Sequence, residues 1–362
     1  MQIDWNCFAN RSGYAQAAQD YLNSLKILDK YDIKVSLLHS SPEQLSLSSQ
    51  SYIDLINLMK KERDPHAIQV YHCIPDMQKR AERLGKTVGF ATFETFEPPK
   101  EWVDVLNTND AVICPSLFNM KIFKHAGVDK PLYYVPHCVN IDAYHPGVIP
   151  SLKSDVFTFM CFGAWKKRKG WPQLLEAWSQ EFKPDEKVRL VIKTDRHTMA
   201  NIAVDQTVRN MGLTRKDIAP IEFESKILTD TELPSFMKSA DCLICPTMGE
   251  GFGIPGLQCM ALGVPVVITN FSGCTDYANE QTATLIEPNR FIIYNEMDNI
   301  PQFRNKKWAN VTTEEVRLKM RFAFQNQSII KAKADAAVSF VKENFSYQKT
   351  AERLSQLFES LQ

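Results

Sequence analysis

Short apolar segments alternate with amphipathic stretches along most of the chain, and this alternation constrains the fold more than any other feature. Apolar runs bounded by turn residues are typical of buried strands, and amphipathic segments between them are typical of connecting helices. In the first half we expect strands at residues 34–38, 67–74, 87–93, 111–116 and 131–139, and helices at 14–28 and 99–109. The alternation predicts an α/β fold built on parallel sheets.

A break near residue 150 separates two such halves. Pro146, Gly147 and Pro150 interrupt the alternation, which begins again at residue 156. In the second half we expect strands or strand-like segments at 156–164, 188–194, 220–225, 241–247 and 264–270, helices at 171–182 and 199–212, a long helical stretch from 312 to 345, and a final helix at 347–361. A chain of 362 residues is too long for one comfortable core. We therefore predict two Rossmann-like domains whose ligands bind outside the carboxyl ends of the strands.

The charge of the chain is balanced, with 42 Lys and Arg residues against 42 Asp and Glu residues. Nonspecific nucleic-acid binding rests on many uncompensated basic contacts, so the balance disfavours a nucleic-acid partner while leaving room for a local basic patch. Residues 1–150 are slightly acidic, with 15 Lys and Arg against 17 Asp and Glu, which points the same way.

No apolar run is long enough to span a membrane, and the first residues lack the basic head and apolar core of a signal peptide. The nine cysteines are scattered, and several lie in apolar, strand-like runs, which are the usual place of buried free thiols. Cys242 and Cys245 have the spacing of a redox or zinc pair, but no second Cys or His pair accompanies them, so we expect core packing. These features favour a protein of the reducing cytoplasm.

A glycine-rich turn at 249–253 follows the apolar segment 241–247 and precedes a helix that begins near Ile254 and Pro255. Its glycines permit positive φ angles and a close approach of the backbone to a ligand. The helix N-terminus offers free N–H groups and a partial positive charge, which suit a phosphate. Glu250 stands beside this anion site, where a carboxylate would accept hydrogen bonds from hydroxyl groups. A sugar phosphate or a nucleotide sugar fits both features, although an isolated turn of this kind is often only structural.

Four consecutive cations, at 166–169, lie in the loop between the strand 156–164 and the helix 171–182. A charge run is usually a solvated face, but this one follows a strand in the same half as the glycine turn. A departing diphosphate gains negative charge in the transition state, and cations already in place stabilise that charge. The loop is therefore a candidate diphosphate site.

Together these motifs resemble those of the retaining GT-B glycosyltransferases of family 4, the glycosyl transferases of group 1. Residues 250–273 resemble the family's donor motif, in which a second acid follows the first after seven residues, and 168–178 resemble its diphosphate-binding segment. Residues 12–22, 93–128 and 133–147 resemble the first turn and helix and the end of the acceptor domain. The resemblance covers most of the chain and implies a GT-B fold.

The resemblance assigns roles to individual residues of the donor site. Glu250 is similar to the acid that holds hydroxyl groups of the donor sugar, and Lys169 to the lysine that binds the diphosphate. Backbone contacts to sugar and phosphate are expected from Gly251, Phe252, Gly253 and Ile254. The family's partner arginine is expected about five residues before Lys169, where this chain has Ala164, so we assign that role to Arg168, whose planar fork suits phosphate.

Two further positions depart from the family pattern. Gln258 stands where the second acid would bind the ribose diol of the nucleotide, and an amide can still pair with a diol, at a cost of roughly 1 kcal/mol. Gly13 is present in the N-terminal turn under the donor phosphates, but Tyr14 and Ala15 follow it in place of a second glycine.

Other candidates lie in the first half. Glu94 follows a strand and is a candidate catalytic residue near the acceptor hydroxyl, with a loop acid or a capping partner as the alternative. His72 has the same two interpretations, whereas His137 is expected to support structure. Trp165 and Trp171 could stack on a base or sugar, although packing is the expected role.

The resemblance implies an enzyme, a hexosyl- or pentosyltransferase that moves a sugar from a nucleoside diphosphate donor to an acceptor hydroxyl with retention of anomeric configuration. The nucleotide sugar is a co-substrate, and no cofactor and no metal are expected, because Lys169 and the helix terminus would neutralise the diphosphate and the chain has no Asp-x-Asp motif. The alternatives are a catalytically degenerate accessory or sugar-nucleotide-binding subunit, and a sugar-nucleotide epimerase or a phosphorylase on the same architecture. The class of acceptor stays open.

The resemblance also sets the expected domains. Residues 1–150 together with 346–362 would bind the acceptor, and 151–345 would bind the nucleotide sugar. In the last helix, apolar residues recur at intervals of three and four, so one face needs a partner. We expect this helix to cross back to the first domain.

Overall fold

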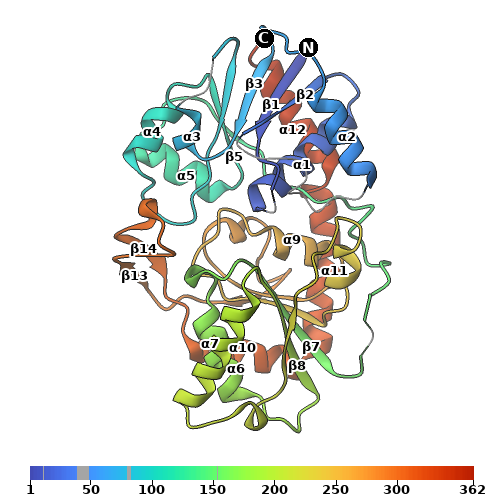
Figure 1. The fold of residues 1–362 in the computed structure, drawn as a ribbon, viewed down its shortest axis with the longest axis vertical. Helices are drawn as coiled ribbons and strands as arrows, with labels where there is room; N and C mark the ends of the chain where they lie inside the picture. The colour runs from blue at the N-terminus through green and yellow to red at the C-terminus, as the bar shows by residue number, and fades with distance from the viewer. Residues whose placement is uncertain (11, 39–48, 80–82, 153) are drawn as a thin grey trace. The chain divides into compact units, whose positions relative to one another are not determined.

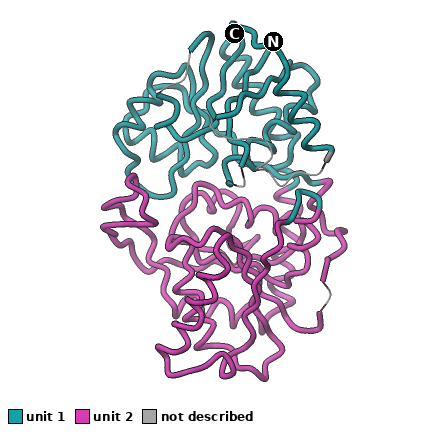
Figure 2. Tube along the Cα trace, in the orientation of Figure 1, with its two compact units in different colours: residues 1–141, 228–231, 342–362 teal, residues 142–227, 232–341 magenta. Residues whose placement is uncertain are grey.

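The structure, a computed structural model, describes residues 1–10, 12–38, 49–79, 83–152 and 154–362 (Figure 1). It divides into two compact units (Figure 2). Unit 1 comprises Met1–Ile141, Leu228–Thr231 and Lys342–Gln362, and unit 2 comprises Asp142–Ile227 and Glu232–Val341. The chain enters unit 2 at Asp142 rather than after the break at residue 150, because the intervening residues pack there: Tyr144 is 8% exposed and its hydroxyl contacts Gln258.

Unit 1 is built on a parallel sheet with the strand order β2-β1-β3-β4-β5-β6. Its strands are β1 (Gln2–Cys7), β2 (Asp32–Leu37), β3 (Ile68–His72), β4 (Thr87–Phe90), β5 (Ala111–Cys114) and β6 (Leu132–Tyr134). The connecting helices are α1 (Gly13–Lys26), α2 (Ser49–Met59), α3 (Pro75–Gln78), α4 (Lys100–Leu106) and α5 (Leu117–Ala126). Every residue of β1, β3, β4 and β5 is buried, as expected for strands covered on both faces.

Unit 2 is built on a second parallel sheet, with the order β12-β11-β10-β7-β8-β9. Its strands are β7 (Phe157–Phe162), β8 (Val188–Lys193), β9 (Ile221–Glu224), β10 (Cys242–Cys245), β11 (Val266–Thr269) and β12 (Thr284–Ile286). Its helices are α6 (Trp171–Glu181), α7 (His197–Asn210), α8 (Leu233–Met237), α9 (Ile254–Ala261), α10 (Thr313–Gln325) and α11 (Gln327–Asn344), whose last three residues belong to unit 1. An antiparallel hairpin, β13 (Phe291–Tyr294) with β14 (Lys306–Ala309), stands apart from this sheet.

Each sheet has a point at which the strand order reverses. In unit 1 the reversal lies between β1 and β3, and in unit 2 it lies between β7 and β10. Ligands of such sheets bind outside the carboxyl ends of the strands at this switch point. In unit 2 the loops after β7 and β10 are those that carry the cation run and the glycine turn.

The C-terminal helix α12 (Tyr347–Glu359) lies beside α1 within unit 1, which confirms the predicted return to the first domain (Figure 1). Its buried face includes Leu354 and Phe358, both 0% exposed, and the Tyr347 hydroxyl donates a hydrogen bond of 2.6 Å to Asp20 on α1. The apolar stripe of this helix thus has the partner that its spacing demands.

The long helical stretch expected from 312 to 345 is two helices rather than one. Asn326, with φ −118° and ψ 51°, leaves the helical region and separates α10 from α11. Its side-chain amide and its backbone N–H both donate to the carbonyl of Phe322, at 2.8 and 2.9 Å, which satisfies this carbonyl at the end of α10.

All nine cysteines are free thiols, and Cys242 and Cys245 lie on the central strand β10 rather than in a shared metal or disulfide site. Within the described part of the chain, none of the helices combines the length and the apolar character that a membrane span requires.

Candidate active site

The loops after β7 and β10 are joined by backbone contacts at the switch point of unit 2. The carbonyl of Arg168 accepts hydrogen bonds from the backbone N–H of Met248, at 2.7 Å, and from the hydroxyl of Thr247, at 3.1 Å. Gly170 has φ +76°, and a Cβ at this position would lie 1.9 Å from the carbonyl oxygen of Pro246. Glycine is therefore required here, and its absence of a side chain lets the cation loop lie directly against the glycine turn.

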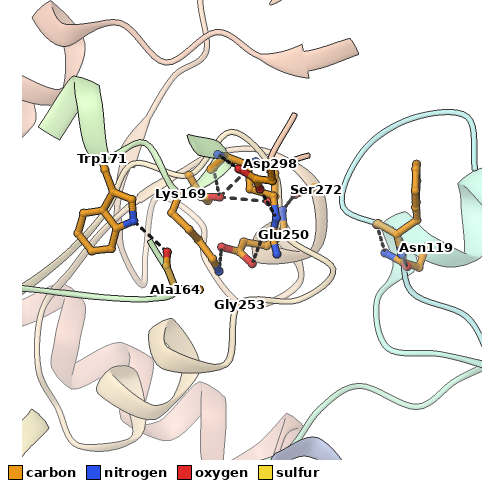
Figure 3. A network of polar contacts seen from close by, with 12 residues as sticks. Asn119, Ala164, Lys169, Trp171, Glu250, Gly253, Ser272 and Asp298 are labelled. Carbon is orange, nitrogen blue, oxygen red and sulfur yellow. Dashed lines mark hydrogen bonds and ion pairs between the residues drawn. The ribbon is translucent and has the colours of Figure 1, made fainter. Parts of the chain in front are cut away.

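Glu250 lies between two of the predicted cations (Figure 3). Its Oε1 is 2.5 Å from Lys169 Nζ, and its Oε2 is 3.5 Å from Arg168 Nη1. The three side chains are 13–19% exposed. Burial raises the pKa of the Glu250 carboxyl, but the charges of Lys169 and Arg168 outweigh it, and the net pKa is lowered. The carboxylate is thus held ionised beside two cations in a partly dehydrated site.

The backbone of Glu250 is fixed by the segment that follows β11. Its N–H donates to the hydroxyl of Ser272 at 2.8 Å, and its carbonyl accepts from the N–H of Gly273 at 3.0 Å. Ser272 adopts φ +61°, and a Cβ on Gly273 would come within 2.1 Å of the carbonyl oxygen of Gly251. Both backbone groups of the acid are therefore satisfied, and its carboxylate has a defined direction.

The glycine turn ends at the start of α9 with a left-handed residue. Gly253 has φ +95°, and its carbonyl accepts a hydrogen bond of 2.6 Å from the Tyr277 hydroxyl. Ile254 is the first helical residue, and the N-cap makes no side-chain hydrogen bond to the N–H groups of the first turn. Phe252 is 2% exposed and packs against Tyr277, so only its backbone is available to a ligand. This geometry matches the turn and helix start expected from the sequence.

Gln258 is buried on α9, with 5% exposure. Its Nε2 donates to the hydroxyl of Tyr144 at 3.2 Å. Its Oε1 has no hydrogen-bond partner among the residues that the structure describes. The amide N–H group of Gln258 is therefore bonded within the protein, and its carbonyl oxygen can accept a hydrogen bond from a ligand.

Asp298 is the main residue that sequence reasoning missed. In the 295–305 connection of the β13–β14 hairpin, its Oδ2 lies 3.2 Å from Arg168 Nε, and its Oδ1 accepts from the Arg168 backbone N–H at 3.4 Å. Its side chain is 0% exposed. Asp298 and Asn299 both have positive φ, which Asp and Asn tolerate better than most residues. The dipeptide signals a tight turn, but nothing in it indicates a contact with a loop 130 residues earlier.

Gly13 and Glu94 belong to unit 1. Gly13 opens α1 behind the Ser12 cap, is exposed, and would meet nothing within 4 Å if it carried a Cβ. Glu94 is half-buried in the loop after β4. Asn119 of α5 holds this loop: its side chain accepts from the Phe93 N–H at 2.6 Å and donates to the Phe93 carbonyl at 3.2 Å (Figure 3). This clamp, which the sequence reasoning also missed, sets the backbone position just before Glu94.

The two candidate histidines are buried. His72 is 0% exposed and stacks on Phe90 at a centroid distance of 4.1 Å. The Tyr21 hydroxyl donates to the Val135 carbonyl at 2.7 Å, so it accepts a hydrogen bond from His137 Nδ1 at 3.0 Å. Burial lowers the pKa of both rings, to about 3 for His137 and well below the usual value for His72. Both are neutral core rings at physiological pH.

The tryptophans of the cation loop pack against each other. Trp171 is 2% exposed, and its indole N–H donates to the carbonyl of Ala164 at 2.9 Å (Figure 3). Trp165 stacks on Trp171 with centroids 4.8 Å apart. This arrangement matches the packing role.

Part of the chain matches a known protein family. Residues 156–293 match the family model described as glycosyl transferases group 1. No curated protein sequence matches the chain significantly. The family match covers the cation loop, the glycine turn and the segment around Ser272.

Solved structures match over nearly the whole chain. Sucrose-phosphate synthase from Thermosynechococcus elongatus has a TM-score of 0.71 at 14% identity, over 100% of this chain and 99% of that chain. Alr3699/HepE of Anabaena, in complex with UDP and glucose, has a TM-score of 0.73 at 14% identity, over 99% and 100%. A trehalose-6-phosphate structure from E. coli, bound with UDP-2-fluoro glucose, has a TM-score of 0.67 at 10% identity, over 100% and 99%.

These likenesses confirm the predicted GT-B fold, with its two Rossmann-like domains. The family match and the fold together support a GT-B glycosyltransferase.

Proposed function

We propose that the protein is a retaining glycosyltransferase of family 4, which transfers a sugar from a nucleoside diphosphate donor to an acceptor hydroxyl. The observation that carries the proposal is the position of Glu250 between Lys169 and Arg168 at the switch point of unit 2. The acid can accept hydrogen bonds from sugar hydroxyls, the two cations can neutralise a diphosphate, and the acid is in direct contact with both cations. This combination is what a bound nucleotide sugar requires.

The proposed donor site uses each of these groups in turn. The diphosphate displaces the Glu250 carboxylate from Lys169 and Arg168, and the positive end of the α9 helix dipole adds to the same anion site. Glu250, held by Ser272, then accepts hydrogen bonds from hydroxyls of the sugar. As the sugar–phosphate bond breaks, negative charge grows on the leaving diphosphate, where the cations are already in place. We expect no metal because the side chains and the helix terminus perform this task.

Arg168 fills the role of the family's missing arginine in this proposal. Ala164 is exposed, and its carbonyl accepts hydrogen bonds from the Trp171 indole and from the Lys166 backbone N–H. The Arg168 guanidinium, by contrast, reaches the same carboxylate as Lys169. A planar guanidinium can make two parallel hydrogen bonds to the diphosphate. This supports Arg168 as the replacement for an arginine at position 164.

The remaining residues of the proposed site have roles toward the nucleotide and the acceptor, whose class stays open. UDP is the first candidate nucleotide, since UDP and UDP-sugars occupy the structurally similar proteins named above. Gln258 would use its Oε1 to accept from the ribose diol while Tyr144 accepts from its amide N–H. Gly13, whose open surroundings allow a close approach to its backbone, would contact the phosphates. Glu94 would orient the acceptor hydroxyl.

A sugar-nucleotide-binding accessory subunit is the second candidate, favoured by Gln258 in place of an acid and by Ala164 in place of an arginine. Such a subunit would bind UDP-glucose without cleaving it. The two functions therefore differ in donor turnover rather than in donor affinity.

A thermal-shift screen of UDP, GDP, ADP and their glucose conjugates tests donor binding first. A ligand at a hundred times its dissociation constant stabilises the folded protein by about 2.7 kcal/mol, which gives a readily measured shift. Slow hydrolysis of the bound donor then separates an enzyme from an accessory subunit. NMR of the anomeric proton of the first-formed product tests retention, and an inverted product would reject it.

A further inference from the structure

We infer that Asp298 is a positioning residue for Arg168, and that the β13–β14 hairpin thereby fixes the direction in which this cation meets the diphosphate. The inference rests on the proposed function and deepens it, because it concerns the same site. It assigns a role to a segment, residues 291–309, that lies outside the two sheets and outside the donor motifs.

Asp298 engages the side of Arg168 that faces away from Glu250. One carboxylate oxygen lies 3.2 Å from Arg168 Nε, and the other accepts from the Arg168 backbone N–H at 3.4 Å. Arg168 Nη1 lies 3.5 Å from Glu250 Oε2. With its Nε edge and its backbone held by one buried carboxylate, the guanidinium presents its Nη edge to the donor site.

The hairpin is itself anchored to both donor loops. Lys167 Nζ lies 4.4 Å from the centre of the Tyr294 ring at the end of β13. At the end of β14 the N–H of Ala309 donates to the carbonyl of Met248 at 3.1 Å, while the N–H of Met248 donates to Arg168. The backbone of Met248 is thus bonded on one side to the hairpin and on the other to the cation loop. Asp298 therefore approaches Arg168 from a hairpin that is bonded to the same two loops.

The charges explain why a buried acid is placed here. Asp298, Arg168, Glu250 and Lys169 form a row of alternating sign, and each neighbouring pair is in contact. When a diphosphate takes over the cations, Glu250 loses both of its partners, but Asp298 keeps its contact with Nε. Asp298 is 0% exposed and does not reach a ligand itself. It holds Arg168 in the binding orientation before the ligand arrives, which lowers the entropy that binding must overcome.

The test compares UDP with uridine, which lacks the diphosphate, in Asp298→Asn. Asparagine keeps the shape of the side chain and tolerates the φ of +59° at this position, but it removes the charge. We expect calorimetry to show UDP affinity reduced by about tenfold and uridine affinity changed by less than about twofold, because only the diphosphate meets Arg168. Asp298→Gly, which also tolerates a positive φ, removes the side chain and is expected to lose at least as much UDP affinity.

A double-mutant cycle shows whether the effect passes through Arg168. In an Arg168→Ala background, Asp298→Asn should leave UDP affinity unchanged within about twofold, since the group that it orients is gone. Glu296→Gln is the matched control: it removes the same charge from the same connection, but Glu296 pairs with Arg304 at 3.7 Å on the exposed surface, and UDP affinity should stay at the wild-type value.

Three results would overturn the inference. Equal losses of UDP and uridine affinity in Asp298→Asn would mark Asp298 as a general structural residue. An undiminished loss in the Arg168→Ala background would show that Asp298 acts elsewhere, and a wild-type UDP affinity in Asp298→Asn would show that it does not act at all. Failure of the wild-type protein to bind UDP, GDP or ADP is a different outcome, which rejects the proposed function and the inference with it.

Discussion

The switch point of unit 2, between β7 and β10, is occupied by charged side chains, whereas the switch point of unit 1, between β1 and β3, is occupied by rings. In unit 2 the carboxylate of Glu250 meets Lys169 and Arg168. In unit 1 His72 at the end of β3 is surrounded by aromatic side chains, which are Trp5, Tyr14, Tyr21 and Phe90. The same topological position thus carries opposite chemistry in the two sheets.

Two buried carboxyls show what this difference does. Glu250 has cationic partners, and its pKa is lowered despite burial. Asp20, on α1 of unit 1, is 7% exposed and has neutral partners, Tyr347 and Gln16, so burial raises its pKa to about 7 against the smaller effect of these hydrogen bonds. In the candidate donor site, by contrast, each of the two cations is paired with at least one acid. The partners of Asp20 in the described part of unit 1 are neutral hydrogen-bonding groups.

The comparison is tested most strongly by Glu250→Gln. Turnover should fall by about 10²–10³-fold, the range found when one preorganised polar group is removed from a transition-state site. UDP affinity should not fall, and we expect it to rise, because the carboxylate that competes with the diphosphate for Lys169 and Arg168 is gone. Steady-state kinetics and calorimetry with UDP provide the two measurements.

Turnover of Glu250→Gln near the wild-type value would remove Glu250 from the active site. A fall in UDP affinity would show instead that the acid mainly orders the two cations. Lys166→Ala is a suitable control, since Lys166 belongs to the same cation run but not to the ion pairs described around Glu250.

The second test concerns Asp20 and the pH dependence of stability. The folded-state pKa of about 7 exceeds the unfolded value of 3.8, so between these pH values the folded state binds the extra proton. Stability is then highest at the acid end of this window and falls as pH rises, by at most about 1.4 kcal/mol per pH unit. Asp20→Asn, which cannot ionise, should weaken this decline in thermal-unfolding scans between pH 5 and pH 8. Glu250, with its lowered pKa, acts in the opposite direction at more acid pH.

Asp54→Asn serves as the control for Asp20, because Asp54 is a more exposed acid of unit 1, on α2, 3.6 Å from Lys26. An unchanged decline in Asp20→Asn would mean that another group causes it. A steeper decline would show that the Asp20 carboxylate is favoured by folding, contrary to the comparison.

A smaller effect is expected from Gln258→Glu. If the amide faces the ribose diol, a carboxylate there would add a charge-assisted hydrogen bond and tighten UDP binding by roughly 1 kcal/mol, or about fivefold. The Tyr144 hydroxyl, which now accepts from the amide, can rotate to donate to the new carboxylate. Calorimetry with UDP and with 2′-deoxy-UDP should show the gain for the ribonucleotide only. An equal gain for both would place the residue away from the diol.

The parts of the site that the sequence predicted are those with local signals. The cation run and the glycine turn each contain their own pattern, and the structure brings Arg168 and Lys169 to Glu250 because parallel strands on either side of a switch point bring their following loops together. The return of α12 to unit 1 was likewise predicted, because its apolar stripe requires a partner and the family resemblance identified that partner as the first domain.

The missed residues act over long sequence separations. Ser272 fixes the backbone of Glu250 from 22 residues away, and Asp298 reaches Arg168 from 130 residues away. A serine and an aspartate in turns are common, and neither pattern carries information on its distant partner. The hairpin that positions Asp298 interrupts the alternation of strands and helices, so the alternation that predicted the sheets did not predict the hairpin.

The smallest effect is expected from substitution of His72, which tests whether the switch point of unit 1 only packs. Neither ring nitrogen of His72 has a hydrogen-bond partner in the described part of the chain, and the side chain is 0% exposed. A buried polar group without a partner costs about 1–3 kcal/mol, and its replacement by an apolar group of similar shape is nearly neutral. His72→Phe, stacked on Phe90 in the same way, should therefore leave the melting temperature and turnover close to their wild-type values. His72→Ala, which leaves a cavity among Trp5, Tyr14 and Tyr21, should lower the melting temperature without a selective effect on UDP affinity. A large loss of turnover in a stable His72→Phe protein would show that the imidazole meets a substrate, and the switch point of unit 1 would then be a second polar site rather than a packed support.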